Sequence, residues 1–136
     1  MTTMTKPADD TAVRLLSFVE PLPGFPDEDS YNLSAIDPRG MLYSLRSVRA
    51  PELRFVLTPT AVFFADYRPD IPAAVAHALG ADDLELMLIL SIGSGLADAT
   101  ANMRAPLAIS PTTARAMQVI LDDERLPMHR RLIPTH

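Results

Sequence analysis

Thirteen prolines are spread along the 136 residues of this chain, and they limit what it can fold into. A proline inside a helix removes a backbone donor and clashes with the preceding turn, so helices rarely pass through one. The apolar runs between the prolines are also short. This punctuation argues against a bundle of long helices and favours short strands joined by turns.

Several segments alternate with the period of two that places successive side chains on opposite faces of a β-strand. The clearest is 98–110, DATANMRAPLAIS, in which every odd position from 99 to 109 is apolar. In 84–92 the leucines fall on one face, so Leu88 and Leu90 are predicted to lie in the core. Together with 116–121, these segments predict an antiparallel meander of consecutive strands.

Turn and capping residues predict one hairpin and one helix. The tetrad 37–40, Asp-Pro-Arg-Gly, matches the first, second and fourth positions of a type I turn and lies between two apolar segments, 31–36 and 41–48. Pro72 suits the start of a short helix over 72–79, and Gly80 suits the residue just after its end.

Length and pattern together predict the domain organisation. A chain of this size is most simply one domain, here 13–136, preceded by a flexible segment over 1–12. The fold class that we expect is mainly β: a small antiparallel β-barrel-like domain with one short helix.

Cysteine is absent, which excludes disulfides, thiol nucleophiles and thiolate metal sites and fits a reducing compartment. The first residues contain no apolar core of a signal peptide, and the apolar run 84–92 is too short to span a bilayer. We therefore expect a cytoplasmic protein with no membrane partner.

The net charge of −5 argues against direct nucleic-acid binding, which needs a concentrated basic surface. The basic cluster 129–131, His-Arg-Arg, is interpreted as a solvated tail. An acidic domain of this kind is attracted to a basic partner instead.

Groups that could carry catalysis are sparse. No two histidines have the spacing of metal ligands, and His77 is interpreted as a surface residue of the predicted helix. The loop 93–95, Gly-Ser-Gly, has no following lysine and is interpreted as a hairpin loop rather than a phosphate site. The polar face of 98–110 carries Asn102 and Arg104 but no group that titrates near neutrality, which is typical of a recognition face. We expect no catalytic residue, no metal and no cofactor.

Several segments resemble one family, the flagellar assembly factor FliW, and they cover well over half of the chain. They are LPGF at 22–25, LYSLRSVRAPELRFVLTPTAVFFADY at 42–67, ATANMRAPLAISPTTARAMQVILDD at 99–123 and LPMHRRL at 126–132. The run from ATAN through APL to QVIL is the most specific part.

The resemblance implies a non-enzymatic regulator with a barrel-like β fold. Proteins of this family bind newly made flagellin, here expected through its C-terminal region, and bind CsrA, the RNA-binding repressor of flagellin translation. Once flagellin is exported, the freed factor captures CsrA and relieves repression.

Candidate partner contacts follow from where the matching segments carry exposed polar groups. Asp66 and Tyr67 combine an acid with an aromatic ring in one predicted loop, and such tyrosines are enriched at interfaces. Asn102, Arg104 and Gln118 are predicted at outward-facing positions of neighbouring strands, and two rim acids complete the set, Asp122 and Asp123.

Two other functions stay open from the residues alone. A small-molecule-binding β-barrel would line its cavity with side chains such as Phe55, Phe63, Phe64 and Met87. An enzyme would have to pair Asp66 or Asp122 with His129, and an acid–base pair buried in a cleft would favour that alternative.

Overall fold

The computed structural model describes residues 13–133; residues 134–136 and the predicted flexible segment, 1–12, lie outside the described range. Within it the β-strands are β1 (Val13–Phe18), β2 (Ser30–Ala35), β3 (Tyr43–Ser47), β4 (Arg54–Pro59), β5 (Glu85–Ser91), β6 (Thr100–Ala101), β7 (Leu107–Ile109), β8 (Arg115–Gln118) and β9 (Arg130–Arg131). The helical elements are α2 (Thr60–Phe63), α3 (Ala73–Leu79) and the 3₁₀ turn η1 (Leu96–Asp98).

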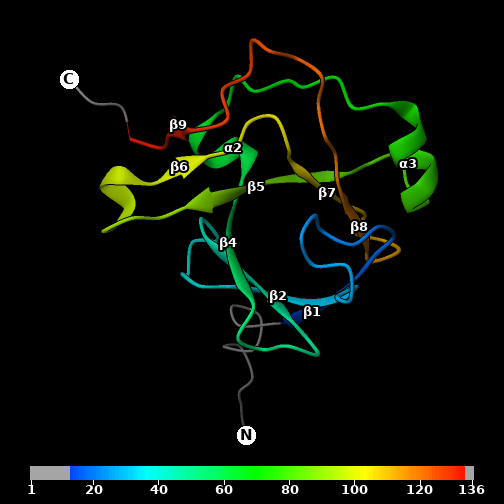
Figure 1. Cartoon of the computed structure of the whole chain (residues 1–136). Helices are drawn as coiled ribbons and strands as arrows, with labels where there is room; N and C mark the ends of the chain where they lie inside the picture. Colours follow the sequence, from blue (N-terminus) through cyan, green and yellow to red (C-terminus); the bar gives the residue numbers. More distant parts are fainter. Residues whose placement is uncertain (1–12, 134–136) are drawn as a thin grey trace, which may run out of the picture.

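Seven of these strands close into a barrel in the order β4-β3-β2-β1-β8-β7-β5, and β5 pairs back onto β4 (Figure 1). The barrel pairs are antiparallel except β1 with β8, which is parallel and aligns Ser17 with Arg115 and Phe18 with Ala116. β6 pairs with β5, and β9 pairs with β6. The prediction of a mainly β, barrel-like domain with one short helix is confirmed, with the parallel pair as an exception to its antiparallel description.

The β2–β3 hairpin turns where the tetrad 37–40 predicts. The backbone N–H of Gly40 donates to the carbonyl of Asp37 (3.3 Å). The Asp37 carboxylate in turn accepts the backbone N–H groups of Met41 (2.9 Å) and Leu42 (2.8 Å). Gly40 has a φ of 70°, a left-handed conformation that a residue without a Cβ adopts at low cost.

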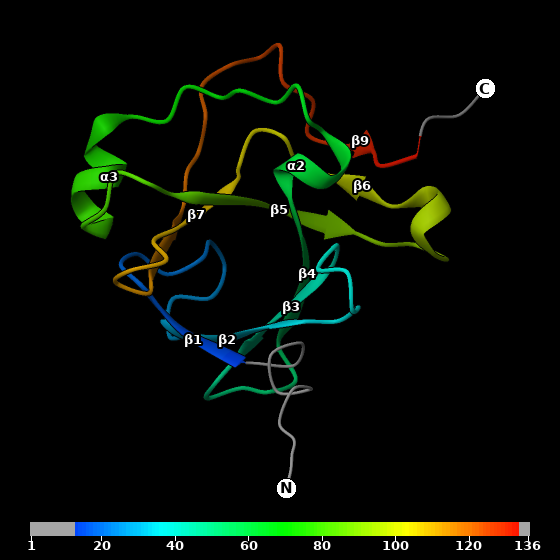
Figure 2. The ribbon, with the colours of Figure 1, turned by 180° about the vertical axis from the view of Figure 1, so that it is seen from behind.

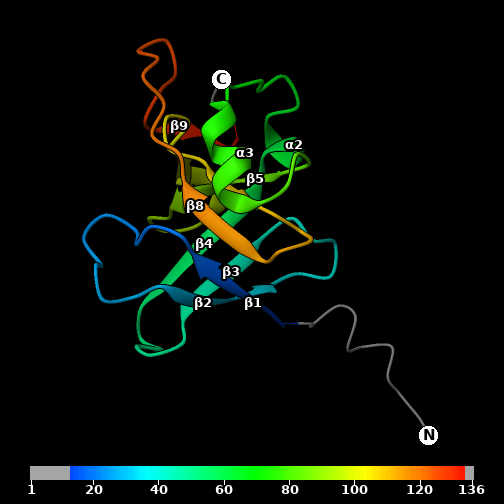
Figure 3. The same ribbon diagram turned by 90° about the vertical axis from the view of Figure 1, so that its right-hand side faces the viewer.

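Helix α3 also lies where its capping residues predict. Pro72 is its N-cap residue, and Gly80 ends it with a φ of 73°. Val75 and Leu79 pack into a cluster on the outer face of β5, β7 and β8, so the helix covers that part of the sheet (Figure 3). No helix within residues 13–133 combines the length and the apolar character needed to cross a membrane.

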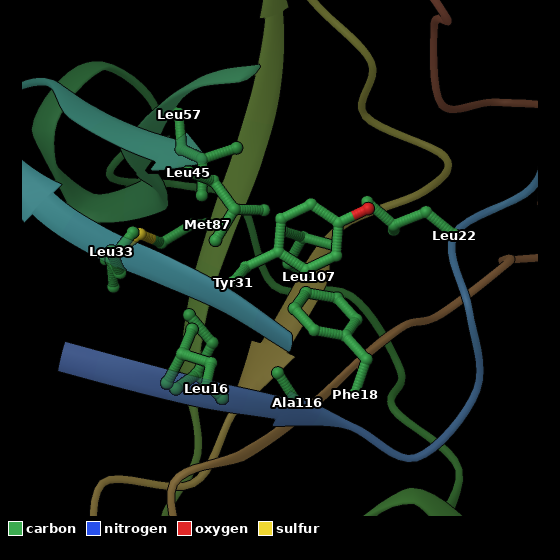
Figure 4. Packing of buried hydrophobic residues seen from close by; sticks show 11 residues of the cluster. Leu16, Phe18, Leu22, Tyr31, Leu33, Leu45, Leu57, Met87, Leu107 and Ala116 are labelled. Carbon is green, nitrogen blue, oxygen red and sulfur yellow. The ribbon is translucent and has the colours of Figure 1, made fainter. Parts of the chain in front are cut away.

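The interior of the barrel is filled by side chains (Figure 4). Ten of them come from barrel strands, and Leu22 enters from the loop after β1. The eleven buried residues of this interior cluster are Leu16, Phe18, Leu22, Tyr31, Leu33, Leu45, Leu57, Met87, Leu107, Ile109 and Ala116.

Strand β5 has two buried faces because it separates the barrel interior from clusters on the outside. Met87 belongs to the interior cluster, whereas Leu88 and Leu90 pack with Phe64 in an outer cluster beside α2. Figure 2 shows α3 and α2 at different points along the length of β5. The predicted burial of Leu88 and Leu90 is confirmed, but Ile92, on the same predicted face, is 42% exposed because it follows the end of β5.

Candidate partner-binding site

Residues 98–110 do not form the single strand that their alternation predicts. β6 ends at Ala101, opposite Leu90, and β7 begins at Leu107, opposite Met87. The five residues 102–106 therefore lie opposite only two residues of β5, 88 and 89. We call residues 102–106 the bulge, since such an insertion disrupts the ladder and bends the strand.

The bulge lies where this segment exchanges one neighbouring strand for another. Both β6 and β7 pair with β5 on one side. On the other side β6 pairs with β9, whereas β7 pairs with β8. Between those pairings the connecting segment 119–127 bonds to the bulge backbone. Backbone N–H groups donate from Val119 to Pro106 (2.8 Å), from Leu121 to Arg104 (2.7 Å) and from Met103 to Pro127 (3.0 Å).

Arg104 holds the connecting segment against the bulge. Its Nε donates to the carbonyl of Leu126 (2.6 Å), and a terminal nitrogen donates to the carbonyl of Glu124 (3.0 Å). The Asn102 side-chain oxygen accepts the backbone N–H of Arg104 (3.0 Å). The prediction that Asn102 and Arg104 occupy outward-facing strand positions is therefore wrong. Both side chains are half-buried in the bulge. They bond there to backbone groups that a regular ladder would otherwise pair.

Tyr67 and Gln118 bond to the same bulge. The Tyr67 hydroxyl donates to the carbonyl of Met103 (2.7 Å), and Gln118 Nε2 donates to the carbonyl of Ala105 (3.2 Å). Tyr67 is only 7% exposed, in contrast to the loop contact that the sequence predicts, because its ring packs in the outer cluster with Phe64. Burial raises the pKa of Tyr67 to about 12.

A hollow of about 540 Å³ lies beside the bulge, and we call its surroundings the bulge site. It is lined by the loop after α2, by Met103 and by the chain leading into β9: Asp66, Tyr67, Arg68, Pro69, Asp70, Met103, Asp123, Arg125, Leu126, Pro127 and Arg130. A second hollow of about 290 Å³ shares part of this lining and adds Leu121 and Asp122. The lining thus combines apolar atoms with charges of both signs.

Two of the arginines at the bulge site, Arg125 and Arg130, have local partners. Arg125 donates to both carboxylate oxygens of Asp123 (3.0 and 3.1 Å), and its side chain and backbone N–H lower the pKa of Asp123. The Arg130 guanidinium lies 5.1 Å from the centre of the Phe64 ring, a cation–π arrangement. Arg130 and Arg131 are exposed, as the prediction of a solvated tail requires, but they form β9 and pair with β6 instead of ending in a free tail.

The structure thus gathers the predicted contact residues at one place but gives them different roles. Asp66 and Asp122 are exposed at the two hollows, and Asp123 is half-buried. The residues that bond to the bulge or within it are Tyr67, Asn102, Arg104 and Gln118. Their contact with a partner remains a prediction.

Sequence reasoning missed Arg68, Arg125 and Arg130 as site residues. They stand in the segments 42–67 and 126–132 that carry the resemblance, or next to them, which is the one signal that could have identified them. Within residues 13–133, no three histidine, aspartate or glutamate side chains cluster as metal ligands.

Comparisons with known proteins agree on one family. A family model described as "FliW protein" matches residues 1–132. The chain is 36% identical over 115 residues to the flagellar assembly factor FliW of Symbiobacterium thermophilum, which covers 82% of this chain and 83% of that protein. It is 33% identical over 114 residues to the factor of the same name from Shouchella clausii, covering 82% and 78%.

A solved structure agrees with these sequence matches. The crystal structure of a flagellar assembly factor FliW superposes with a TM-score of 0.82 at 27% sequence identity. The match covers 98% of this chain and 91% of that one, so the similarity extends over the barrel and the segments around the bulge.

Proposed function

This chain belongs to the FliW family of flagellar assembly factors, and we propose that it binds flagellin and, when free of flagellin, binds and antagonises the repressor CsrA. In this proposal residues 13–136 act as one unit in the cytoplasm, where both partners are synthesised. The C-terminal region of flagellin occupies the protein until export, and CsrA binds afterwards. Neither nucleic acid nor a membrane is a direct partner.

The observation that carries the proposal is the exposed, mixed-charge bulge site on a hydrogen-bonded base. Asp66 and Arg130 are exposed at its rim, and Leu126 adds apolar surface. The bulge beneath is held by Arg104 and Tyr67 through backbone carbonyls. A preorganised surface loses little conformational freedom on binding, which favours recognition of a protein partner.

A role without catalysis is supported by the chemistry of the site. No histidine, serine or threonine is among the residues that line the 540 Å³ hollow. Nucleophilic catalysis needs a nucleophile with a general base within hydrogen-bond reach, and histidine is the most frequent general base. Filling of the barrel interior by the eleven-residue cluster likewise argues against the small-molecule-binding alternative.

Calorimetry tests the proposal directly. CsrA is titrated into the free protein and then into protein saturated with flagellin, and binding is expected in the first titration only. Equal CsrA affinity in both would contradict mutual exclusion. No binding of either partner to the free protein would remove the assignment of partners altogether.

A charge reversal tests the bulge site itself. Asp66→Lys is the first choice, because Asp66 is exposed and its replacement leaves the bonds to the bulge intact. We expect weaker binding of at least one partner by roughly tenfold, the scale of losing a favourable charge contact. Asp82→Lys, an equal charge change at an exposed position outside the lining of the hollow, is the matched control. An equal loss of partner affinity in both variants would show that the effect comes from net charge and not from the bulge site.

A further inference from the structure

A groove of about 400 Å³ lies between the loop 24–28 and the turn 50–53. It shares no lining residue with the bulge site, and the proposed function does not make use of it. Its lining residues are Gly24, Phe25, Pro26, Asp27, Glu28, Ala50, Glu52 and Leu53, and we call it the 24–28 groove.

The apolar floor of the 24–28 groove is anchored in the barrel. Phe25 and Leu53 are half-buried and pack against the interior cluster. The Phe25 ring meets Phe55 edge-on at 5.6 Å between centroids, and Phe55 lies 6.3 Å from Tyr31. These aromatic contacts hold the floor of the groove in place, and the solvent-facing side of the floor can contact a ligand.

Hydrogen bonds tie the two walls of the groove together. The buried Ser47 hydroxyl donates to the Glu28 carboxylate on one wall and accepts the backbone N–H of Ala50 (3.0 Å) on the other. The Arg49 guanidinium donates to the carbonyl of Asp27 (3.2 Å). The groove is therefore preformed, and a ligand would not have to order it.

The charged side chains that line the groove are all acidic. Asp27, Glu28 and Glu52 line it, and no lysine, arginine or histidine is among the lining residues. Two neighbouring arginines bond to backbone carbonyls of the walls, Arg49 to Asp27 (3.2 Å) and Arg46 to Pro51 (2.6 Å). A half-buried apolar floor between carboxylates is complementary to an apolar side chain flanked by cations.

We propose that the 24–28 groove is a docking site for a partner segment that presents one apolar side chain between lysines or arginines. The apolar side chain lies on Phe25 and Leu53, and the flanking cations approach Asp27 and Glu52. The 24–28 groove is a different surface from the bulge site, so peptide binding there does not depend on whether the bulge site binds flagellin or CsrA.

A peptide titration followed by NMR of the ¹⁵N-labelled protein tests the docking site. The probe is the capped peptide Ser-Lys-Leu-Lys-Ser, with Ser-Glu-Leu-Glu-Ser and Ser-Lys-Ser-Lys-Ser as comparisons. Saturable shifts are expected at the amides of Gly24, Phe25, Ala50 and Leu53 with the first peptide, and much weaker binding of the other two. Raised salt weakens this binding, because the exposed charge contacts are screened.

Two double variants separate the groove from overall charge. Asp27→Lys with Glu52→Lys is expected to weaken the first peptide about tenfold, through loss of two exposed charge contacts. Asp82→Lys with Asp83→Lys makes the same change in net charge at exposed positions outside the groove lining and is expected to leave the affinity unchanged.

Three results would overturn the proposal. They are equal affinity in the two double variants, shifts that map to other residues, and equal binding of the glutamate peptide. Self-association that disappears in the Asp27→Lys, Glu52→Lys variant would assign the groove to a second copy of this chain instead.

Discussion

Two buried tyrosines show how differently one residue type is accommodated. The Tyr67 hydroxyl donates to the Met103 carbonyl at 2.7 Å. The Tyr31 hydroxyl points toward Leu22 in the barrel interior (Figure 4) and, among residues 13–133, is the one buried side-chain polar atom without a hydrogen-bond partner. Removing the two hydroxyls should therefore have different effects on stability.

Tyr67→Phe should lower the free energy of unfolding by about 1–3 kcal/mol. The substitution removes the buried hydrogen bond that the Tyr67 hydroxyl donates to the Met103 carbonyl. Urea denaturation monitored by circular dichroism measures the loss. An unchanged denaturation midpoint would show that the bond contributes nothing to holding the bulge.

Tyr31→Phe should leave stability unchanged or raise it by up to about 1–3 kcal/mol, the cost of burying an unpaired hydroxyl. The ring and its contacts with Phe18 (5.0 Å) and Phe55 (6.3 Å) are retained. The same urea experiment applies, with Tyr67→Phe as the matched substitution. A loss as large as that of Tyr67→Phe would mean that the hydroxyl has a partner after all.

The stability of the protein should fall in alkaline solution through Tyr67. Its pKa is raised from 10.0 to about 12 in the folded protein, so the folded state retains the proton more strongly than the unfolded chain. The contribution is complete below pH 10 and is lost as the pH rises toward 12. Unfolding measured across this range should show a smaller decline in Tyr67→Phe than in the parent protein.

At the scale of elements, the bulge decides how the sheet divides between two neighbours. β6 continues toward β9, β7 continues toward β8, and the connecting segment 119–127 crosses between them. Arg104 is central to this arrangement, because its guanidinium bonds to two carbonyls of that segment. A charged side chain that bonds to backbone carbonyls in this way contributes more than an ordinary surface residue.

Arg104→Ala should cost about 1–3 kcal/mol, and Arg104→Lys should recover only part of it, because an ammonium lacks the planar fork. Leu88→Ala, within the outer cluster, should cost about 2–5 kcal/mol. The two variants differ in hydrogen exchange. Arg104→Ala should lower the protection of amides in 119–127 more than that of the rest of the sheet, whereas Leu88→Ala should lower protection throughout the sheet. Unaltered exchange at Leu121 in Arg104→Ala would contradict the role given to Arg104.

At the scale of the whole molecule, closure of the barrel depends on contacts between distant parts of the chain. β1 meets β8 through a short parallel pairing, and β4 meets β5 although helices α2 and α3 lie between them in the sequence. Arg14 in β1 also reaches Glu85 in β5, with 2.9 Å between nitrogen and oxygen. Both side chains are more than a third exposed, so solvent screens this pair.

A double-mutant cycle of Arg14→Ala and Glu85→Ala should give a coupling energy of about 0.2–1 kcal/mol. The coupling should shrink as salt is raised, because a half-exposed pair is screened. Unfolding free energies of the four proteins at low and high salt measure it. A larger, salt-independent coupling would show that the pair is sheltered from solvent and helps to hold β1 against β5.

Local pattern was enough to identify the β2–β3 hairpin with its turn at 37–40, helix α3 and the burial of Leu88 and Leu90. It did not identify β9 or separate β6 from β7. The identified features depend on neighbours in the chain: period-two alternation, turn geometry and capping residues act within a few positions. The family segments are equally local, which is why the assignment to FliW could be made from the sequence and agrees with the comparisons.

Only the tertiary structure decided three features. They are the bulge, the buried position of Tyr67 and the burial of β5 on both of its faces. Residues 98–110 alternate almost perfectly, yet their strand breaks because its two halves pair with different strands, β9 and β8. Which strands become neighbours depends on barrel closure, and alternation within one segment carries no information about the register of another. The Asn102 and Arg104 side chains follow that register, and they bond to the chain itself instead of projecting from a strand face.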